Sequence, residues 1–196
     1  MSLLVNGCID KCKDITQGGA ELGFVTVEGV TFATMVDSLL AVKYLVYDKK
    51  ECTLTELVDA LKANWEGYEV LQAKAKNRAP KYGKDDAEAD DLAREFMHFW
   101  ADETWKYKTT DTNRRFRPGM LSWNYWVGAG YILKASANGR TENSFLSNAI
   151  CPSNGADTKG PTSNSNSVGV ALGGKNEEGD YLNCLPNGAS HTLTFN

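Results

Sequence analysis

The sequence is poor in the residues that build metal centres and disulfide frameworks. It has only two histidines, His98 and His191, and five cysteines in 196 residues. Cys8 and Cys12 stand one helical turn apart, but no second Cys or His pair with matching spacing follows, and a zinc site takes at least three protein ligands. An odd number of cysteines without framework spacing is typical of reduced thiols in a cytoplasm. We therefore predict no metal site in this chain.

An excess of one charge and long apolar runs are also lacking. The formal net charge of −4 gives no electrostatic basis for binding nucleic acid or an anionic membrane. The apolar run at residues 1–5 is too short for a signal peptide, and no stretch reaches the roughly 20 residues that span a bilayer. With 42% hydrophobic and 23% charged residues, the composition is that of a soluble globular protein with a sizeable core.

A near match to a phosphate-binding loop begins at Gly169. The spacing to Gly174 and Lys175 is met, but Asn176 stands where Ser or Thr would bind magnesium, and no apolar strand precedes the loop. We interpret this segment as the end of a helix with glycine caps.

Hydrophobic periodicity predicts three helices in the first 108 residues. The first, around Val36 and Leu40, is apolar enough to be buried on most sides. The second begins at a capping box, Thr53 followed three residues later by Glu56. The third runs over about 86–107. The residues expected to face inward from this third helix are Leu92, Phe96, Phe99, Trp100 and Tyr107.

The aromatic-rich segment 116–126 predicts strands or extended structure. In a strand, successive side chains point to opposite faces, so Trp123 and Tyr125 would share one face. The residues that alternation places on the other face are Ser122, Asn124 and Trp126.

The rest of the second half is dominated by loop-forming residues. Segments 131–133 and 190–195 are further strand candidates, whereas 138–166 is dense in Gly, Ser, Asn, Thr and Pro and predicts a long irregular connection. Pro161 suits the first turn of a short helix that ends near Gly173.

The most informative segment is 77–90, Asn-Arg-Ala-Pro-Lys-Tyr-Gly-Lys-Asp-Asp-Ala-Glu-Ala-Asp. Pro80 and Gly83 end one helix, and Asp85 or Asp86 caps the next; local physics would accept many other sequences there. This segment resembles the glycyl radical enzymes, the family of pyruvate formate-lyase and its dehydratase and decarboxylase relatives. Further segments resemble the family in its own order: 6–11, 13–20, 36–43, 61–68, 116–119, 135–140, 151–157, 159–162 and 185–189. The resemblance covers essentially the whole chain.

The resemblance implies a fold and an activity. The expected class is α+β (or α/β), with residues 1–196 as part of one pyruvate formate-lyase-like domain, helical over 1–108 and strand- and loop-rich over 109–196. In the family such segments belong to a ten-stranded barrel, built from two antiparallel five-stranded halves and wrapped by helices. Its members use a thiyl radical to cleave C–C, C–O or C–N bonds of small organic substrates. Within the family, the sequence resembles the dehydratases and decarboxylases more than pyruvate formate-lyase itself.

The family also implies partners and a setting. A separate activating enzyme, dependent on S-adenosylmethionine and an iron–sulfur cluster, installs the radical on a backbone glycine. No dissociable organic cofactor is needed for the radical step, and none is expected in this chain. Oxygen destroys the radical, so an anaerobic cytoplasm is implied.

Two motifs of the family's chemistry do not occur in this sequence. No cysteine is followed two residues later by Glu, as in the family's Gly-Cys-x-Glu loop, and no Arg-Val-x-Gly-Tyr segment is present. We therefore assign no catalytic residue and expect an internal fragment of a longer enzyme, inactive alone. Two alternatives stay open. The chain is one part of a split enzyme, completed in trans by chains that carry the two missing motifs, or it is a non-catalytic binding or scaffold module. For the partner, both a homodimer and a complementing chain stay open.

The resemblance finally suggests which residues line the substrate chamber. Glu28 lies in a loop that in the family approaches the chamber, where its carboxylate would accept a hydrogen bond from a substrate hydroxyl, or act as a base if burial raises its pKa. Segment 116–126 resembles a barrel segment that shapes the pocket, and its aromatic content hints at a bulky substrate. The alternatives are a surface turn for Glu28 and plain core packing for 116–126. The candidate lining residues are Thr26, Glu28, Thr31, Ser122, Asn124 and Trp126.

Overall fold

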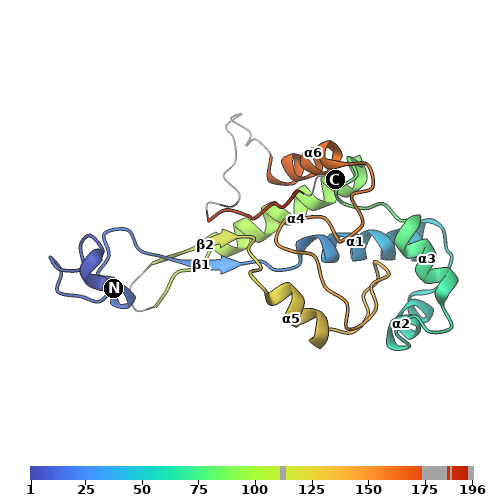
Figure 1. Ribbon diagram of the computed structural model, residues 1–196, viewed down its shortest axis with the longest axis horizontal. Coiled ribbons are helices and arrows are strands. Elements are labelled where there is room, and N and C mark those ends of the chain that lie inside the picture. The colour runs from blue at the N-terminus through green and yellow to red at the C-terminus, as the bar shows by residue number, and fades with distance from the viewer. Residues whose placement is uncertain (111–113, 174–184, 186, 194–196) are drawn as a thin grey trace.

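The computed structural model describes residues 1–110, 114–173, 185 and 187–193. Its regular elements, in chain order, are the 3-10 turns η1 (Ser2–Leu4) and η2 (Ile15–Gln17), strand β1 (Phe24–Glu28), helix α1 (Phe32–Val42), the π-helical turn η3 (Lys43–Asp48), helices α2 (Leu54–Lys62), α3 (Glu69–Asn77) and α4 (Ala87–Trp105), strand β2 (Arg115–Gly119), and helices α5 (Tyr125–Ile132) and α6 (Pro161–Leu172). The N-terminal turns project at one end of the molecule and α2 and α3 lie at the other (Figure 1). The mixed helix-and-strand class predicted from the sequence is confirmed.

Strands β1 and β2 pair in parallel. Phe24 is opposite Arg115, and Glu28 is opposite Gly119. Because parallel neighbours cannot be joined by a tight turn, the intervening helices α1 to α4 serve as the crossover. The carboxyl ends of both strands therefore meet just before α1, and Glu28 ends a strand where the sequence had suggested a loop. The ten-stranded barrel stays a prediction.

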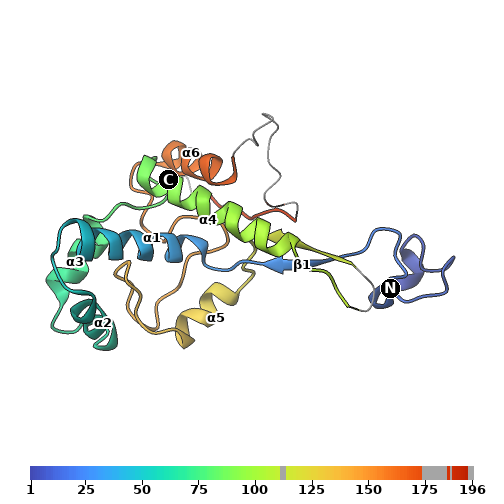
Figure 2. The same cartoon turned by 180° about the vertical axis from the view of Figure 1, so that it is seen from behind.

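Helices α1, α4 and α6 build the larger core. Both α1 and α6 contact α4, as the two opposite views show (Figure 2). Phe32 of α1 packs edge-on against Tyr82 with ring centroids 5.4 Å apart. The residues of α4 that are buried are Ala89, Asp90, Ala93, Met97, Ala101 and Thr104. Small side chains along this face let the neighbouring helices approach closely.

The inward face predicted for α4 is wrong at two positions. Phe99 is 57% exposed and Tyr107, just beyond the helix, is 59% exposed. The other three predicted residues are half-buried and pack against the larger core. The sequence pattern predicted large apolar side chains on the buried face of α4. The structure buries several alanines there instead, because α1 and α6 lie close to this helix.

Helices α2 and α3 surround a second, smaller core. The predicted capping box is confirmed: the Glu56 N–H donates to Thr53 Oγ1 (3.2 Å), and the Thr53 N–H donates to Glu56 Oε2 (2.7 Å). Beyond α2, Trp65 is only 2% exposed and donates through Nε1 to the Arg140 carbonyl oxygen (3.2 Å). Helix α3 is the helix that Pro80 and Gly83 were predicted to end, but its start was not predicted. Its one fully buried residue is Ala75, so the apolar signal is weak.

The segment predicted to continue as a strand turns into helix α5 instead. Asn124 precedes the helix, and its carbonyl oxygen accepts hydrogen bonds from the N–H groups of Val127 (3.1 Å) and Gly128 (3.3 Å). Residues 131–133 end this helix and form no strand. A side chain at Gly130 would collide with the Ser144 carbonyl oxygen, which shows that the segment around Ser144 packs directly against α5. This tertiary contact supports a helix that the local sequence does not favour.

The last third is irregular, as predicted, up to helix α6. Pro161 occupies the first turn of α6 and Gly173 follows its last residue, which confirms the helix-end interpretation of Gly169; residues 174–176 lie outside the described part. The expected strand over 190–195 is not seen at 190–193, and 194–196 lie outside it. Within the described residues, no helix has the length and apolarity needed to cross a membrane.

Candidate functional site

The candidate site is built around Glu28, the last residue of β1. The strand register sets Glu28 opposite Gly119 of β2, and the carboxylate occupies the space that a side chain at position 119 would fill. The glycine is therefore required by a close approach of the Glu28 side chain and not by an unusual backbone angle.

A third segment, 187–190, runs beside the end of β2. The Asn187 N–H donates to the Pro118 carbonyl oxygen (3.2 Å), and the Met120 N–H donates to the Gly188 carbonyl oxygen (3.0 Å). This docking brings the Asn187 side chain to Glu28, where Nδ2 donates to Oε1. The site thus joins parts of the chain that are 159 positions apart.

The two carboxylate oxygens of Glu28 are unequally satisfied. Oε1 accepts from Asn187, whereas Oε2 is buried and has no hydrogen-bond partner among the described residues. A buried polar atom without a partner is uncommon in native proteins and is costly. The Thr26 side chain and the Leu121 N–H lie near enough to the carboxylate to favour its charged form, but neither makes a direct hydrogen bond to Oε2. Oε2 is therefore the atom of this site that can accept a hydrogen bond from a further group.

Burial raises the pKa of Glu28 above its ordinary value. The side chains of Asn187 and Thr26 and the backbone N–H of Leu121 oppose this shift, because each of them favours the charged form. The raised pKa means that this carboxyl group holds a proton more tightly than an ordinary glutamate does.

The sequence led us to propose Glu28 and Thr26 as site residues, but not Asn187. The Pro-Asn-Gly sequence at 186–188 is a turn signal, and nothing local shows what this turn docks against. Thr31 precedes α1 in a left-handed conformation (φ 66°), and its side chain makes no capping hydrogen bond. It is half-buried.

The three candidates from the second half are not gathered on one strand face. Ser122 is buried and its Oγ accepts a hydrogen bond from the Ala149 N–H. Asn124 is exposed at the start of α5. Trp126 packs edge-on against Phe145 with centroids 5.2 Å apart. The predicted alternation is wrong because residues after 124 follow helical geometry.

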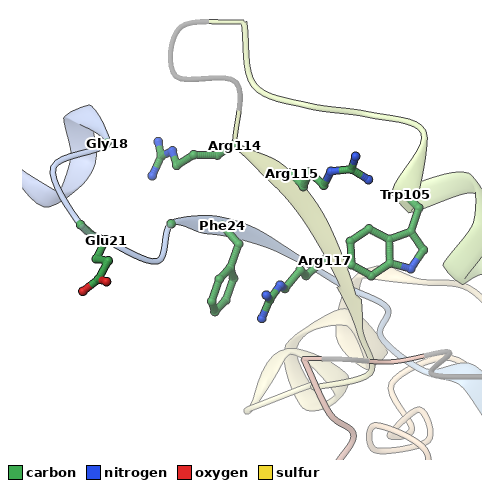
Figure 3. Close-up of a pocket in the computed structure, with 9 residues that line it drawn as sticks. Gly18, Glu21, Phe24, Trp105, Arg114, Arg115 and Arg117 are labelled. Atoms are coloured by element: carbon green, nitrogen blue, oxygen red, sulfur yellow. The ribbon is translucent and has the colours of Figure 1, made fainter. Parts of the chain in front are cut away.

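An open depression lies at the other end of the strand pair, and arginine side chains dominate it (Figure 3). The Arg114 guanidinium donates to the Thr16 carbonyl oxygen (3.2 Å), and the Arg117 guanidinium lies 4.1 Å from the Phe24 ring centroid. The first contact ties the N-terminal segment to the residue before β2, and the second joins β2 to β1. The depression is therefore a junction between parts of the fold, and it contains none of the predicted site residues.

The cysteines are dispersed. Cys8 is buried and Cys12 is exposed; Cys184 lies outside the described residues. Across the described part of the chain, no cluster of three or more His, Cys, Asp or Glu side chains is arranged to hold a metal ion.

Comparison with known proteins identifies the family. Residues 1–130 match the model of the family described as Pyruvate formate lyase-like. The chain belongs to this family. The resemblance to glycyl radical enzymes found in the sequence is thereby confirmed, together with the dehydratase and lyase character of its relatives.

Three relatives illustrate the similarity of this pyruvate formate lyase-like chain. It is 40% identical over 162 residues to trans-4-hydroxy-L-proline dehydratase of Clostridioides difficile, covering 83% of this chain and 20% of the relative. It is 36% identical over 156 residues to isethionate sulfite-lyase of Bilophila wadsworthia, covering 79% and 18%. The structure of the glycerol-bound B12-independent glycerol dehydratase from Clostridium butyricum superposes with a TM-score of 0.78 at 39% identity, covering 85% and 21%. The chain thus spans about a fifth of the length of these relatives.

Proposed function

We propose that this chain forms part of the catalytic domain of a glycyl radical dehydratase or lyase, and that Glu28 lines the substrate chamber of the complete enzyme. The observation that carries the proposal is the buried Glu28 Oε2 atom, which has no partner among the described residues. Its position at the carboxyl ends of two parallel strands supports the same role, since functional groups are commonly placed at such strand ends.

Glu28 has the chemistry to recognise a hydroxyl group. Asn187 holds Oε1, which leaves Oε2 to accept a hydrogen bond from a substrate hydroxyl and so orient the bond that is cleaved. Relatives of the chain are named for hydroxyproline and glycerol dehydration, and both compounds carry hydroxyl groups. We accordingly propose a small hydroxylated substrate for the complete enzyme.

The remaining features of the complete enzyme follow the family. We propose that residues 1–196 form part of one domain, that β1 and β2 belong to its ten-stranded barrel, and that the enzyme works in an anaerobic cytoplasm as a homodimer or with a complementing chain. The radical would be installed by a separate activating enzyme. The sequence contains no Gly-Cys-x-Glu motif, so the residues of this chain would shape and position the substrate.

The test compares variants of the complete enzyme after activation. Glu28→Ala and Glu28→Gln are measured beside Glu66→Gln, which changes an exposed glutamate. The substrates tried are hydroxyproline, glycerol and isethionate, and the glycyl radical is quantified by electron paramagnetic resonance. We expect unchanged radical content in all three variants, with kcat/KM of Glu28→Ala reduced by about tenfold or more, the size expected for one lost hydrogen bond to a charged group.

Two results would overturn the proposal. If Glu28→Ala and Glu28→Gln both keep kcat/KM within about twofold of the unmodified enzyme, Glu28 does not contact substrate. If no radical can be installed in the unmodified enzyme, the assignment to glycyl radical chemistry is wrong.

A further inference from the structure

A polar cavity of about 240 Å³ lies away from the Glu28 site. It is bounded by α1, the end of α3 and two irregular segments, 138–140 and 153–156. In both views the chain that follows α5 runs back toward α1 and α3 (Figures 1 and 2). None of the six candidate lining residues borders it.

Lys81 is the residue that makes this cavity unusual. The side chain is buried, with the residue only 5% exposed, and its Nζ atom has no hydrogen-bond partner among the described residues. An ammonium group carries three donors, and leaving them unsatisfied inside a protein is costly. Burial accordingly lowers the pKa of Lys81, although the nearby Asp37 opposes the shift.

Asp37 does not satisfy the Lys81 ammonium directly. Its carboxylate is fully buried; Oδ1 accepts from the Tyr82 N–H (2.9 Å) and Oδ2 accepts from Ser153 Oγ (2.7 Å). Between Asp37 and Lys81 the described chain shows no ion pair within 4.0 Å. Both carboxylate oxygens of Asp37 thus accept hydrogen bonds from other groups. Lys81 lines the cavity, and its Nζ atom has no acceptor among the described residues.

The other charges at the cavity are mostly positive. The Arg140 guanidinium donates to uncharged oxygens, including the carbonyl oxygens of Thr141 (3.1 Å) and Ser144 (2.8 Å). These contacts hold the loop together and do not neutralise the positive charge of Arg140. Lys76 is exposed, and its stem lies against Gly139. Three cationic side chains therefore line the cavity together with one carboxylate, Asp37.

Asn138 adds a neutral donor. Its Oδ1 atom accepts from Ser136 Oγ (2.7 Å) and from the Arg140 N–H (3.3 Å), which fixes the orientation of the amide. The opposite atom, Nδ2, makes no hydrogen bond within the part of the chain that the structure describes. A donor with a fixed direction and a buried ammonium are the groups that recognise an oxyanion.

We propose that this cavity binds a small oxyanion, a carboxylate or a phosphate, through Lys81 Nζ and Asn138 Nδ2, with Lys76 at the rim. Because one water takes about 30 Å³ of liquid, a cavity of about 240 Å³ has room for a small organic acid or inorganic phosphate. The proposal does not depend on the function proposed for Glu28.

The test is a thermal-melting titration of the full chain with sodium acetate, phosphate and sulfate, each compared with chloride at equal ionic strength. We expect a saturable rise in Tm of about 4 °C once the anion exceeds its Kd tenfold. The preferred probe identifies the ligand class, acetate for a carboxylate and phosphate for a phosphate group. Lys81→Met and Asn138→Asp should abolish the rise, since one removes the cation and the other replaces a donor with a negative charge.

Two further variants keep the test decisive. Lys76→Gln changes an exposed side chain and should weaken anion binding several-fold without loss of folding. If Lys81→Met does not fold, the test therefore rests on Lys76→Gln and Asn138→Asp. Lys62→Gln, an exposed lysine of α2 outside the cavity, should leave the response unchanged. The proposal is wrong if no anion gives a saturable rise beyond chloride, which means that water alone fills the cavity, or if Asn138→Asp and Lys76→Gln respond like the unmodified chain.

Discussion

Gly119 and the Glu28 carboxylate compete for one volume at the carboxyl end of the parallel strand pair. A Cβ atom at position 119 would lie too close to both carboxylate oxygens. The backbone of Gly119 has no positive φ, so the glycine is required by its neighbour across the pair. The two positions are therefore coupled energetically.

This coupling predicts the effect of Gly119→Ala. The added methyl group would displace the Glu28 carboxylate and break its hydrogen bond to Asn187, which should destabilise the chain by about 1–3 kcal/mol. In a Glu28→Ala background the same substitution should cost much less, because the competing atoms are gone. Urea unfolding of the single and double variants measures the difference. Equal costs in both backgrounds would show that another contact is responsible.

The raised pKa of Glu28 predicts a pH dependence of stability. The folded-state pKa lies above the ordinary value of 4.5, so the folded protein holds this proton more tightly than the unfolded chain. Stability is then lost as the pH rises from the ordinary pKa through the folded-state pKa. Glu28→Gln cannot ionise and should avoid this loss, so its Tm relative to the unmodified chain should rise between pH 4 and pH 7. Glu66→Gln serves as control; a pH-independent difference for Glu28→Gln would contradict the prediction.

The capping box of α2 predicts a cost for Thr53→Ala. This change removes the Oγ1 atom that accepts from the Glu56 N–H and should lower the free energy of unfolding by about 1 kcal/mol. Thr55→Ala alters the same residue type two positions later, where the side chain is exposed, and should stay within about 0.5 kcal/mol. Both are read from urea unfolding, and similar losses for the two variants would show that the cap contributes little.

In the helical part of the chain, we expect substitution of Asp37 to cause the largest loss of stability. Asp37→Ala would leave the buried Tyr82 N–H without an acceptor and remove the carboxylate whose charge favours the charged form of Lys81. We expect a loss of about 3–5 kcal/mol. Ser153→Ala removes only one of the bonds to Asp37 and should cost about 1–2 kcal/mol. Chemical unfolding ranks the two, and a smaller loss for Asp37→Ala than for Ser153→Ala would be inconsistent with this account.

Elements with a local cause were predictable from sequence. The Thr53 capping box, the start of α6 at Pro161 and its end at Gly173 all depend on residues within one turn of the feature they define. The inward face of α4 was predicted poorly, because which side chains are buried depends on how closely α1 and α6 approach. Phe99 is a large apolar residue that this packing leaves exposed.

The residues of the candidate site also divide into those with a local signal in the sequence and those without one. Glu28 and Thr26 were proposed as lining residues because they stand close together in sequence, within a segment that resembles a known family. Ser122, Asn124 and Trp126 were grouped by an alternation that helix α5 does not follow. Asn187 was not proposed as a site residue, because no local pattern connects it with position 28.

By itself, the sequence determined the family of this chain, its helix caps and the composition of its irregular last third. These depend on the identity and spacing of neighbouring residues, which a linear pattern records. Only the tertiary structure decided the parallel pairing of β1 with β2, the contact of Asn187 with Glu28 and the burial of Lys81 beside Asp37. Each of these brings distant segments together, and the free energy that selects them comes from burial and hydrogen bonding across the whole fold.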